Sequence, residues 1–303
     1  MRVGVWGAGN LGPGLAYRLV TTPFVSELHW TNQTYDKIVP KVIDIEHGLA
    51  FSPACHTVRG YPQDSVAEML PNLDLLILTL GGRVKPGMTR ADVYGQNATI
   101  YRETVIPVLR DVFAGIILVI TNPVDLMARL IYREAKIDHH RVLGLGTVVE
   151  TARLQASLGS YLSPKRAARD VWAYAVGTHD PNFIPIAMPG LAVGDNTDEQ
   201  ELSDLLSAAR DEVAKGADRV KTQSGSSLHP VVEGAIKVAE AIALDRRSIL
   251  TVSVLDRSSP EEFFYSLPCC IGSSGVLTRH EDLLARIVYI KQRNGAVIAF
   301  VLF

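Results

Sequence analysis

Two glycine-rich stretches in the first third of the chain have residue types and spacing suited to binding anions. The first, GAGNLG at residues 7–12, lies between the apolar run Val3–Trp6 and a helical pattern from Gly9 to about Val20. Glycines allow a tight turn there and let backbone N–H groups approach a pyrophosphate at the start of a helix. A GxGxxG pattern is weak alone, but between a strand and a helix it predicts a dinucleotide site. The candidate cofactor contacts are Gly7, Gly9, Asn10, Leu11 and Gly12.

The second stretch, GGRVKPGMTR at residues 81–90, is both flexible and basic. Two glycines begin it, and Arg83, Lys85 and Arg90 supply three cations. Glycine gives the backbone conformational freedom, and clustered cations attract a negative ligand. The sequence therefore predicts a loop that closes over a small anion, although the apolar Val84 stands at its centre.

The end of the second apolar run bears on the choice of dinucleotide. An acidic residue at this place accepts hydrogen bonds from the adenosine ribose in many NAD-binding proteins. Here Leu28–Thr31 is followed by Asn32, whose amide can bond a ribose hydroxyl but does not repel a 2′-phosphate. No arginine follows, and Lys37 is the only nearby cation. NAD is therefore the expected cofactor, and NADP is not excluded.

The elements that position these loops are predicted by alternating apolar and helical patterns. Strand-length apolar runs occur at 3–6, 28–31, 73–79 and 115–120, with helical patterns at 9–20, 35–49 and 91–113. Such alternation is typical of βαβ units around a parallel sheet. The expected fold class is α/β, with a Rossmann-type doubly wound parallel sheet over residues 1–145 as the dinucleotide-binding domain.

Residues 146–303 differ in pattern and are expected to form an α+β substrate and catalytic domain. Helices are predicted from about Val148, at 198–220 and at 228–244, and strands at 171–176, 183–188, 248–254 and 264–271. The chain ends in the apolar segment RNGAVIAFVLF at 293–303. Because exposed apolar segments promote aggregation, this segment is expected to be buried, either as an added strand or against another subunit.

Composition excludes several classes of partner. The 303 residues carry a formal net charge of −2, which argues against nucleic acid because phosphate-backbone binding needs an excess of Lys and Arg. No apolar run reaches the roughly 18 residues of a membrane helix, so no membrane partner is expected. The N-terminus lacks a signal-peptide pattern, and the three cysteines have no metal-ligand spacing. The expectation is a cytoplasmic protein with reduced thiols and no metal.

Six motifs in order then connect the chain to a known family. They are GAGNLG at 7–12, IDIEHGLAF at 43–51, GGRVKPGMTR at 81–90, TNPVD at 121–125, GTVVETAR at 146–153 and VGTH at 176–179. From Met1 to about Val276 the chain resembles the lactate/malate dehydrogenase family. The resemblance implies an oxidoreductase that moves hydride between a nicotinamide cofactor and a small 2-hydroxy or 2-keto acid. It also implies a homodimer or homotetramer with a small carboxylate as substrate.

The resemblance assigns a role to each matching residue. His179 matches the acid/base, and histidine suits this role because its ordinary pKa is close to neutral pH. Glu150 stands where the family has the aspartate that orients this histidine. Arg153 matches the residue that binds the substrate carboxylate, and Arg90 matches the loop arginine that closes on the substrate carbonyl. Asn122 matches the residue beside the substrate oxygen and the nicotinamide.

Three further residues are assigned to binding by the same resemblance. Ser227 stands where other members carry a small residue or threonine facing the substrate. Gly81 and Asn97 are expected beside the cofactor, together with Asn122.

Departures from the family pattern predict an unusual substrate. The family's lactate enzymes place glutamine at position 84 and its malate enzymes place arginine there, whereas this chain has Val84. Valine leaves a second carboxylate without a cation, unless the adjacent Arg83 turns inward. Glu150 is longer than aspartate by one methylene, so its pairing with His179 requires repacking. After the histidine comes Asp180-Pro181, which stiffens the backbone and adds a carboxylate. A standard lactate or malate enzyme is therefore not expected.

Three alternatives to a 2-hydroxy acid dehydrogenase stay open. One is a reductase of a 2-imino acid on the same scaffold, which would still use Arg153 for the carboxylate. Another is a catalytically impaired dinucleotide-binding homologue, although the retention of His179, Arg153 and Arg90 argues against it. An NAD-using glycosidase would require a metal bound by Cys and His, and no cysteine lies near His179 in the sequence.

Overall fold

The computed structural model describes the chain apart from residues 111, 163, 181, 188–198, 258–260, 280–288, 294–295 and 301–303. Pro181 and the predicted element ends at Met188 and Asp198 therefore lie outside the described residues.

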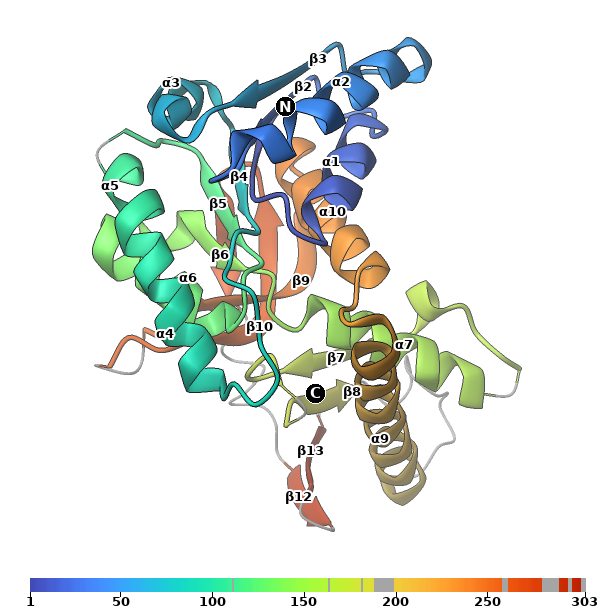
Figure 1. Cartoon of the computed structure of the whole chain (residues 1–303). Helices are drawn as coiled ribbons and strands as arrows, with labels where there is room; N and C mark the ends of the chain where they lie inside the picture. Colours follow the sequence, from blue (N-terminus) through green and yellow to red (C-terminus); the bar gives the residue numbers. More distant parts are fainter. Residues whose placement is uncertain are drawn as a thin grey trace.

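A nine-stranded sheet forms the centre of the molecule (Figure 1). Its strands are β1 (Arg2–Trp6), β2 (Glu27–Thr31), β3 (Thr57–Tyr61), β4 (Leu75–Leu78), β5 (Ile116–Val119), β6 (Val142–Gly144), β9 (Ser248–Leu255), β10 (Phe264–Gly272) and β11 (Gly275–Arg279). Six of them are parallel in the order β3-β2-β1-β4-β5-β6. This order is that of a dinucleotide-binding sheet, so the predicted α/β fold with a doubly wound parallel sheet is confirmed.

Helices cover both faces of this sheet, as continuous apolar strands require. On one face lie α1 (Gly12–Val20) and α10 (His229–Ala243), which pack against each other (Figure 1). On the other face lie α4 (Arg90–Ile100), α5 (Ile106–Leu109) and α6 (Val124–Ala135). Two apolar cores result. Leu15, Trp30 and Val238 belong to the first core, and Leu78, Tyr101 and Met127 to the second.

Some predicted elements differ from those observed. The helix predicted at 91–113 is a composite, in which a π-helical turn at Tyr101–Val105 separates α4 from α5. Pro107 has no N–H to continue the helical ladder, and the helical segment ends at Leu109 rather than Phe113. The helix predicted from Gly9 begins at Gly12, because residues 9–11 complete the turn. Strands β3 and β6, helix α2 (Val39–Gly48) and the short α3 (Val66–Met69) complete this half.

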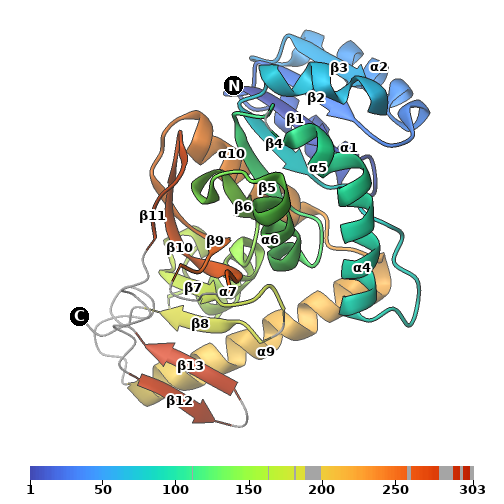
Figure 2. The ribbon, with the colours of Figure 1, turned by 90° about the vertical axis from the view of Figure 1, so that its left-hand side faces the viewer.

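The segment after Gly144 leaves the central sheet. It contains α7 (Val148–Tyr161), β7 (Ala173–Val176), β8 (Ile184–Ala187) and the long α9 (Glu199–Ser224). Helix α9 packs on α7 and runs past β8 (Figure 2). The predicted helices and strands of this region are present.

Residues Ala296–Phe300 of the apolar tail form an added strand. Strand β13 (Ala296–Phe300) pairs parallel with β8 and antiparallel with β12 (Tyr289–Arg293), in a four-stranded sheet ordered β12-β13-β8-β7. Of the two fates expected for this tail, the structure shows the first. Strand β13 thus pairs along its length with β12 and at its last two residues with β8, both within this chain.

The central sheet crosses the predicted boundary at residue 145. Strands β9, β10 and β11 come from the second half of the chain but extend the sheet antiparallel beside β6. A separate unit at 146–303 stays a prediction, and the strands at Ser248–Leu255, Phe264–Gly272 and Gly275–Arg279 lie in the sheet of the first half.

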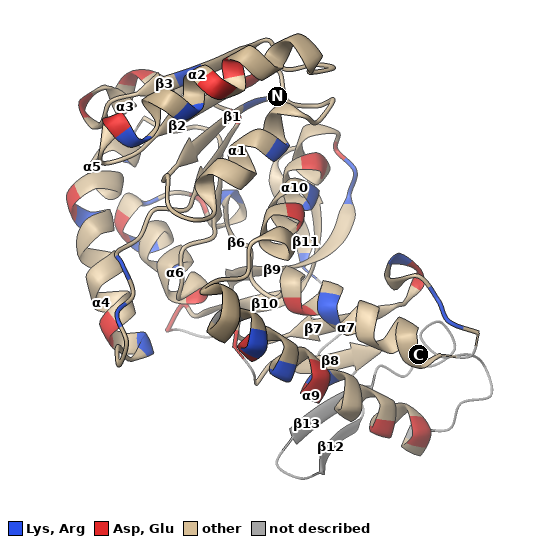
Figure 3. Cartoon of the chain, turned by 45° about the vertical axis from the view of Figure 1, so that its right-hand side comes forward, with Lys and Arg blue, Asp and Glu red and all other residues tan. Residues whose placement is uncertain are grey.

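Charges of both signs are mixed along the outer helices. Figure 3 shows Lys and Arg interspersed with Asp and Glu on α9 and α10, without a continuous basic face among the described residues in this view. Within the described parts of the chain, no helix is long and apolar enough to cross a membrane.

Candidate active site

The glycine loop after β1 has the close backbone contacts that its sequence predicts. Gly7 has a φ of 129°, and a Cβ added to it would lie 2.6 Å from the backbone N of Leu80. A Cβ on Gly12 would lie 2.3 Å from the carbonyl oxygen of Gly7. Only glycine fits at both positions, so the loop packs directly on its own backbone before α1 begins. Leu11 immediately precedes α1, and Asn10 is exposed in the turn.

The Asn32 side chain links this loop to the end of β2 by a hydrogen bond. Its Oδ1 accepts a hydrogen bond from the N–H of Ala8 at 3.0 Å, and its Nδ2 donates to the carbonyl oxygen of Thr34 at 3.0 Å. The indole of Trp30 adds a bond to the Gly7 carbonyl at 2.9 Å. The Asn32 amide thus positions the loop, and a contact with the ribose stays a prediction.

Asn97 joins the two loops at the carboxyl ends of β4 and β5. The side chain is buried, its Oδ1 accepts from the N–H of Gly82 at 2.8 Å, and its Nδ2 donates to the Asn122 carbonyl at 2.7 Å. An added Cβ on Gly81 would lie 3.2 Å from the same Oδ1. Asn97 therefore sets the spacing between the basic loop and the Asn122 turn, and the Asn122 side chain is exposed. Direct cofactor contacts by Gly81, Asn97 and Asn122 stay predictions.

His179 and Glu150 form a hydrogen-bonded pair. Glu150 lies in the first turn of α7 with its side chain 9% exposed, and its Oε2 is 2.9 Å from the Nδ1 of His179. His179 follows β7, whose end is fixed by two backbone bonds between Gly177 and Ser266. The longer glutamate thus keeps hydrogen-bond distance. The ring nitrogen opposite Glu150, Nε2, is the one available to a substrate.

Asp125 supports the backbone of the histidine. It lies in the first turn of α6, where the helix dipole favours a carboxylate. Its Oδ2 accepts the His179 N–H at 3.1 Å, and its Oδ1 accepts the Ser253 hydroxyl at 2.7 Å. Asp125 was part of the TNPVD motif but was not predicted as a site residue, because nothing local indicates that α6 and β7 meet.

Arg153 is held on the same side of α7 as Glu150. One guanidinium nitrogen donates to the Ser227 hydroxyl at 2.8 Å, and the other lies 3.5 Å from the Oε1 of Glu150. Ser227 precedes α10, so α7 and the turn after α9 together orient the arginine. Arg153 and Ser227, which were each predicted to contact the substrate, therefore lie side by side, and their contact with a substrate stays a prediction.

Arg90 reaches across from the basic loop to the histidine segment. Its guanidinium lies 3.4 Å from an oxygen of Asp180 and 3.7 Å from an oxygen of Asp125. The Asp180 carboxylate is itself fixed, because it accepts from the Thr178 hydroxyl and the Asn182 N–H, both at 2.7 Å. Val84 is 60% exposed, and Arg83 is exposed beside it. The loop thus contacts the histidine segment through Arg90, while Val84 at its centre faces solvent.

Burial and neighbouring charges shift the pKa values of His179 and Asp125. Burial alone would lower the pKa of His179, but the hydrogen bond and charge of Glu150, with the charge of Asp125, hold it above its ordinary value. Burial raises the pKa of Asp125, although the bonds from Ser253 and His179 act in the opposite direction. A raised pKa suits a histidine that gives up a proton near neutral pH.

Comparisons with known proteins agree with this geometry. A sequence model described as lactate/malate dehydrogenase, NAD binding domain, matches residues 1–144. The chain is 31% identical over 265 residues to the L-lactate dehydrogenase of Oceanobacillus iheyensis, which covers 83% of this chain and 78% of that protein. It is 30% identical over 289 residues to L-lactate dehydrogenase B of Hordeum vulgare, over 91% and 82% of the two chains.

The chain belongs to the lactate/malate dehydrogenase family. It is therefore an NAD-dependent oxidoreductase, as the motifs indicated. A lactate dehydrogenase from a Medee basin deep-sea metagenome library has the same fold, with a TM-score of 0.81 and 26% identity, over 93% of this chain and 92% of that one.

The glycine loop of this family member fits the pyrophosphate of NAD. A Cβ added to Gly9 would have no heavy atom within 4 Å, so the backbone there is open to a close ligand. The same loop leads into the N-terminus of α1, whose unpaired N–H groups and dipole favour phosphate. Gly7, Gly9, Asn10, Leu11 and Gly12 are the residues that would hold it.

Proposed function

We propose that the chain interconverts a small 2-hydroxy acid and its 2-keto acid, and that it is neither a standard lactate nor a standard malate enzyme. The observation that carries the proposal is the His179–Glu150 pair at 2.9 Å, next to an arginine held by Ser227 at 2.8 Å. Together these groups offer a proton donor and a carboxylate anchor beside the N-terminal end of α7. NAD, when bound, supplies or accepts the hydride.

Each side chain has a defined part in the reduction of a keto acid. Arg153 binds the substrate carboxylate with its planar guanidinium, which fixes the keto carbon relative to His179. The imidazolium of His179 gives its Nε2 proton to the keto oxygen as negative charge develops there. Glu150 stabilises the imidazolium and holds the ring. Arg90 closes over the oxygen and stabilises its developing charge. The oxidation runs through the same steps in reverse.

The preferred substituent is apolar or small. Val84 stands at the centre of the loop that closes on the substrate, and valine offers no donor to a second carboxylate. Arg83 is exposed next to it, so closure would have to turn its side chain inward to replace that donor. A monocarboxylate with an aliphatic substituent fits this loop better than a dicarboxylate.

A 2-imino acid is a second candidate, favoured by the carboxylate of Asp180. Three carboxylates lie beside His179 or Arg90. They belong to Asp125, Glu150 and Asp180. A protonated imine carries positive charge at the reacting bond, and such charge is stabilised by nearby carboxylates. Arg153 would hold the carboxylate of either acceptor.

The test is to incubate the protein with NADH and a panel of 2-keto acids and cyclic 2-imino acids while following the absorbance of NADH. The proposal expects the highest kcat/KM with a 2-keto monocarboxylate whose aliphatic substituent is larger than the methyl group of pyruvate. Highest activity with oxaloacetate or pyruvate would overturn the specificity, and highest activity with an imine would select the second candidate. If no acceptor in the panel causes NADH to be consumed, the protein is an impaired homologue. The assembly as a homodimer or homotetramer and the cytoplasmic location also stay predictions, the first open to analytical ultracentrifugation.

A further inference from the structure

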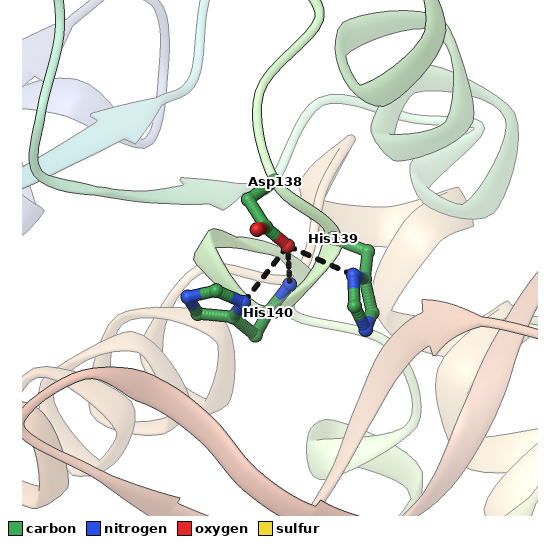
Figure 4. Close-up of side chains that lie close together, drawn as sticks. All are labelled: Asp138, His139 and His140. Carbon is green, nitrogen blue, oxygen red and sulfur yellow. Dashed lines mark hydrogen bonds and ion pairs between the residues drawn. The ribbon is translucent and has the colours of Figure 1, made fainter.

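A cluster of two histidines and one aspartate lies outside the cleft, at the opposite end of β6. Asp138, His139 and His140 occupy the short turn between α6 and β6 (Figure 4). β6 runs from this turn toward the segment that carries Glu150. The cluster therefore lies at the N-terminal end of β6 and the active site beyond its C-terminal end. The hydride-transfer site uses none of the three residues.

The donor atoms of the cluster converge on one point. The Oδ1 of Asp138 lies 2.8 Å from the Nδ1 of His139 and 2.8 Å from the Nδ1 of His140. Figure 4 shows the two rings on either side of the carboxylate. All three donor atoms lie within 4.8 Å of one another. Around a tetrahedral ion with bonds of about 2.0–2.2 Å, donors are separated by about 3.3–3.6 Å, so small ring rotations suffice.

The backbone beneath the cluster is firmly packed. The guanidinium of Arg141 donates to the carbonyl oxygens of Phe113 and Gly115, both at 3.2 Å. On the other side the first residue of β11 approaches closely, because a Cβ on Gly275 would lie 2.2 Å from the His140 carbonyl oxygen. The three side chains remain 30% to 50% exposed. The turn is therefore held in place while its donors are open to solvent.

We propose that Asp138, His139 and His140 bind one divalent transition-metal ion such as Zn²⁺. Imidazole and carboxylate donors suit zinc and its neighbours, whereas magnesium and calcium prefer oxygen alone. Each ring binds the metal through Nδ1. A neutral ring therefore releases its Nδ1 proton to solvent and takes up a proton on Nε2, so the charge of the ring does not change. Three protein ligands leave at least one position for water. The sequence expectation of no metal rested on the spacing of the cysteines, and that spacing could not indicate this site because the cluster contains no cysteine.

An anion is the competing occupant of this region. The adjoining pocket, of about 550 Å³, is also lined by Arg257, Thr278 and Arg279. The arginines oppose a cation and attract a phosphate or carboxylate. However, the Asp138 carboxylate stands between the two imidazoles, at the place where an anion would have to accept their protons. The position between the three donors therefore favours a cation, and the arginines reduce its affinity.

The test uses the full-length protein, stripped with a chelator, desalted and titrated with Zn²⁺ by calorimetry and with Co²⁺ by visible absorption. We expect one ion per chain, a rise in Tm with Zn²⁺, and at least a tenfold loss of affinity in His139→Gln, His140→Gln and Asp138→Asn. His56→Gln is the matched control, because His56 is another exposed histidine. Cys270→Ser tests the partly exposed thiol as an alternative ligand.

Retention of binding in both controls, with its loss in the three cluster variants, supports the site. Absence of zinc binding overturns it, as does zinc binding that survives His139→Gln and His140→Gln. A rise in Tm with inorganic phosphate but not with Zn²⁺ would also overturn it and assign the pocket to an anion. The site rests on no step of the proposed reaction. The cluster variants should therefore keep their dehydrogenase activity whichever substrate is correct.

Discussion

The Nδ1 of His179 lies 2.9 Å from the Oε2 of Glu150, although the chain has one more methylene there than the family's aspartate. The pair keeps its distance because Glu150 starts from the first turn of α7 and Asp125 holds the backbone N–H of His179 at 3.1 Å. A carboxylate in this place does two things, since it fixes the ring and favours its protonated form.

The first prediction concerns the pH dependence of this pair. Reduction requires imidazolium, and Glu150 holds the pKa of His179 above its ordinary value, so reductive kcat/KM should fall only as pH rises through that raised pKa. Glu150→Gln removes the negative partner and should move the alkaline limb to lower pH. The measurement is kcat/KM for reduction against pH in both proteins. Glu150→Asp is the control, and it should keep the limb near its original position. An unmoved limb in Glu150→Gln would remove Glu150 from the pair.

A second prediction concerns the carboxylate anchor. Arg153→Lys keeps the charge but loses the paired donors. The activation free energy that governs kcat/KM should therefore rise by about 1.5–3 kcal/mol, the scale of a hydrogen bond to a charged group. The Kd for NADH should be unchanged. Ser227→Ala leaves the guanidinium in place without its 2.8 Å partner and should cause a smaller loss. Equal substrate kinetics in Arg153→Lys and the wild type would place the carboxylate elsewhere.

The third prediction separates the two candidate acceptors through Asp180. Its carboxylate lies 3.4 Å from Arg90, in a partly exposed pair worth about 0.2–1 kcal/mol. Asp180→Asn removes negative charge beside the acceptor. KM should therefore fall a few-fold for an anionic keto acid and rise for a cationic imine. Asp180→Glu is the control that keeps the charge. The same change for both classes would show that Asp180 acts only on the loop.

Cofactor choice gives the fourth prediction. In Asn32→Asp the carboxylate still accepts the Ala8 N–H, which holds the glycine loop, while the bond to the Thr34 carbonyl is lost. The new charge would face a 2′-phosphate, and two like charges about 4 Å apart cost about 1 kcal/mol even in water. The ratio of kcat/KM with NADPH to that with NADH should therefore fall at least fivefold. An equal loss with both cofactors would mean that position 32 does not face the ribose.

Local patterns predicted most of the sheet, and two of the three strands that they missed, β3 and β6, have physical reasons. Thr57–Tyr61 is an edge strand with Arg59 and Gly60 in it, so it has no continuous apolar run. β6 has three residues, too few to show a period. The pairing of β9 with β6 joins segments about a hundred residues apart, and no local pattern specifies it.

The site followed the same rule. His179, Glu150 and Arg153 could be named from the sequence, because they lie in the short motifs GTVVETAR and VGTH. The contacts of Asp125 with His179 and of Asn97 with the Asn122 turn could not be predicted, since they depend on how loops from different strands meet.

The last prediction concerns Val84, which is 60% exposed at the centre of the loop. When the loop closes on a dicarboxylate, the second carboxylate would face valine and lose water without gaining a donor. An unpaired buried charge costs about 3–5 kcal/mol, so oxaloacetate should be poorer than a matched monocarboxylate by a factor of about a hundred to a few thousand. Val84→Arg supplies the missing fork and should move the preference toward oxaloacetate, while lowering kcat/KM for aliphatic substrates.

The measurement is kcat/KM for oxaloacetate and for an aliphatic 2-keto acid in Val84→Arg, Val84→Leu and the wild type. Val84→Leu changes size without charge, so it should leave oxaloacetate a poor substrate. Arg83→Gln tests the neighbouring cation, which is exposed beside Val84. If the wild type prefers oxaloacetate and loses that preference in Arg83→Gln, then Arg83 turns inward on closure. The substrate would then be a dicarboxylate, held by the residue before the valine.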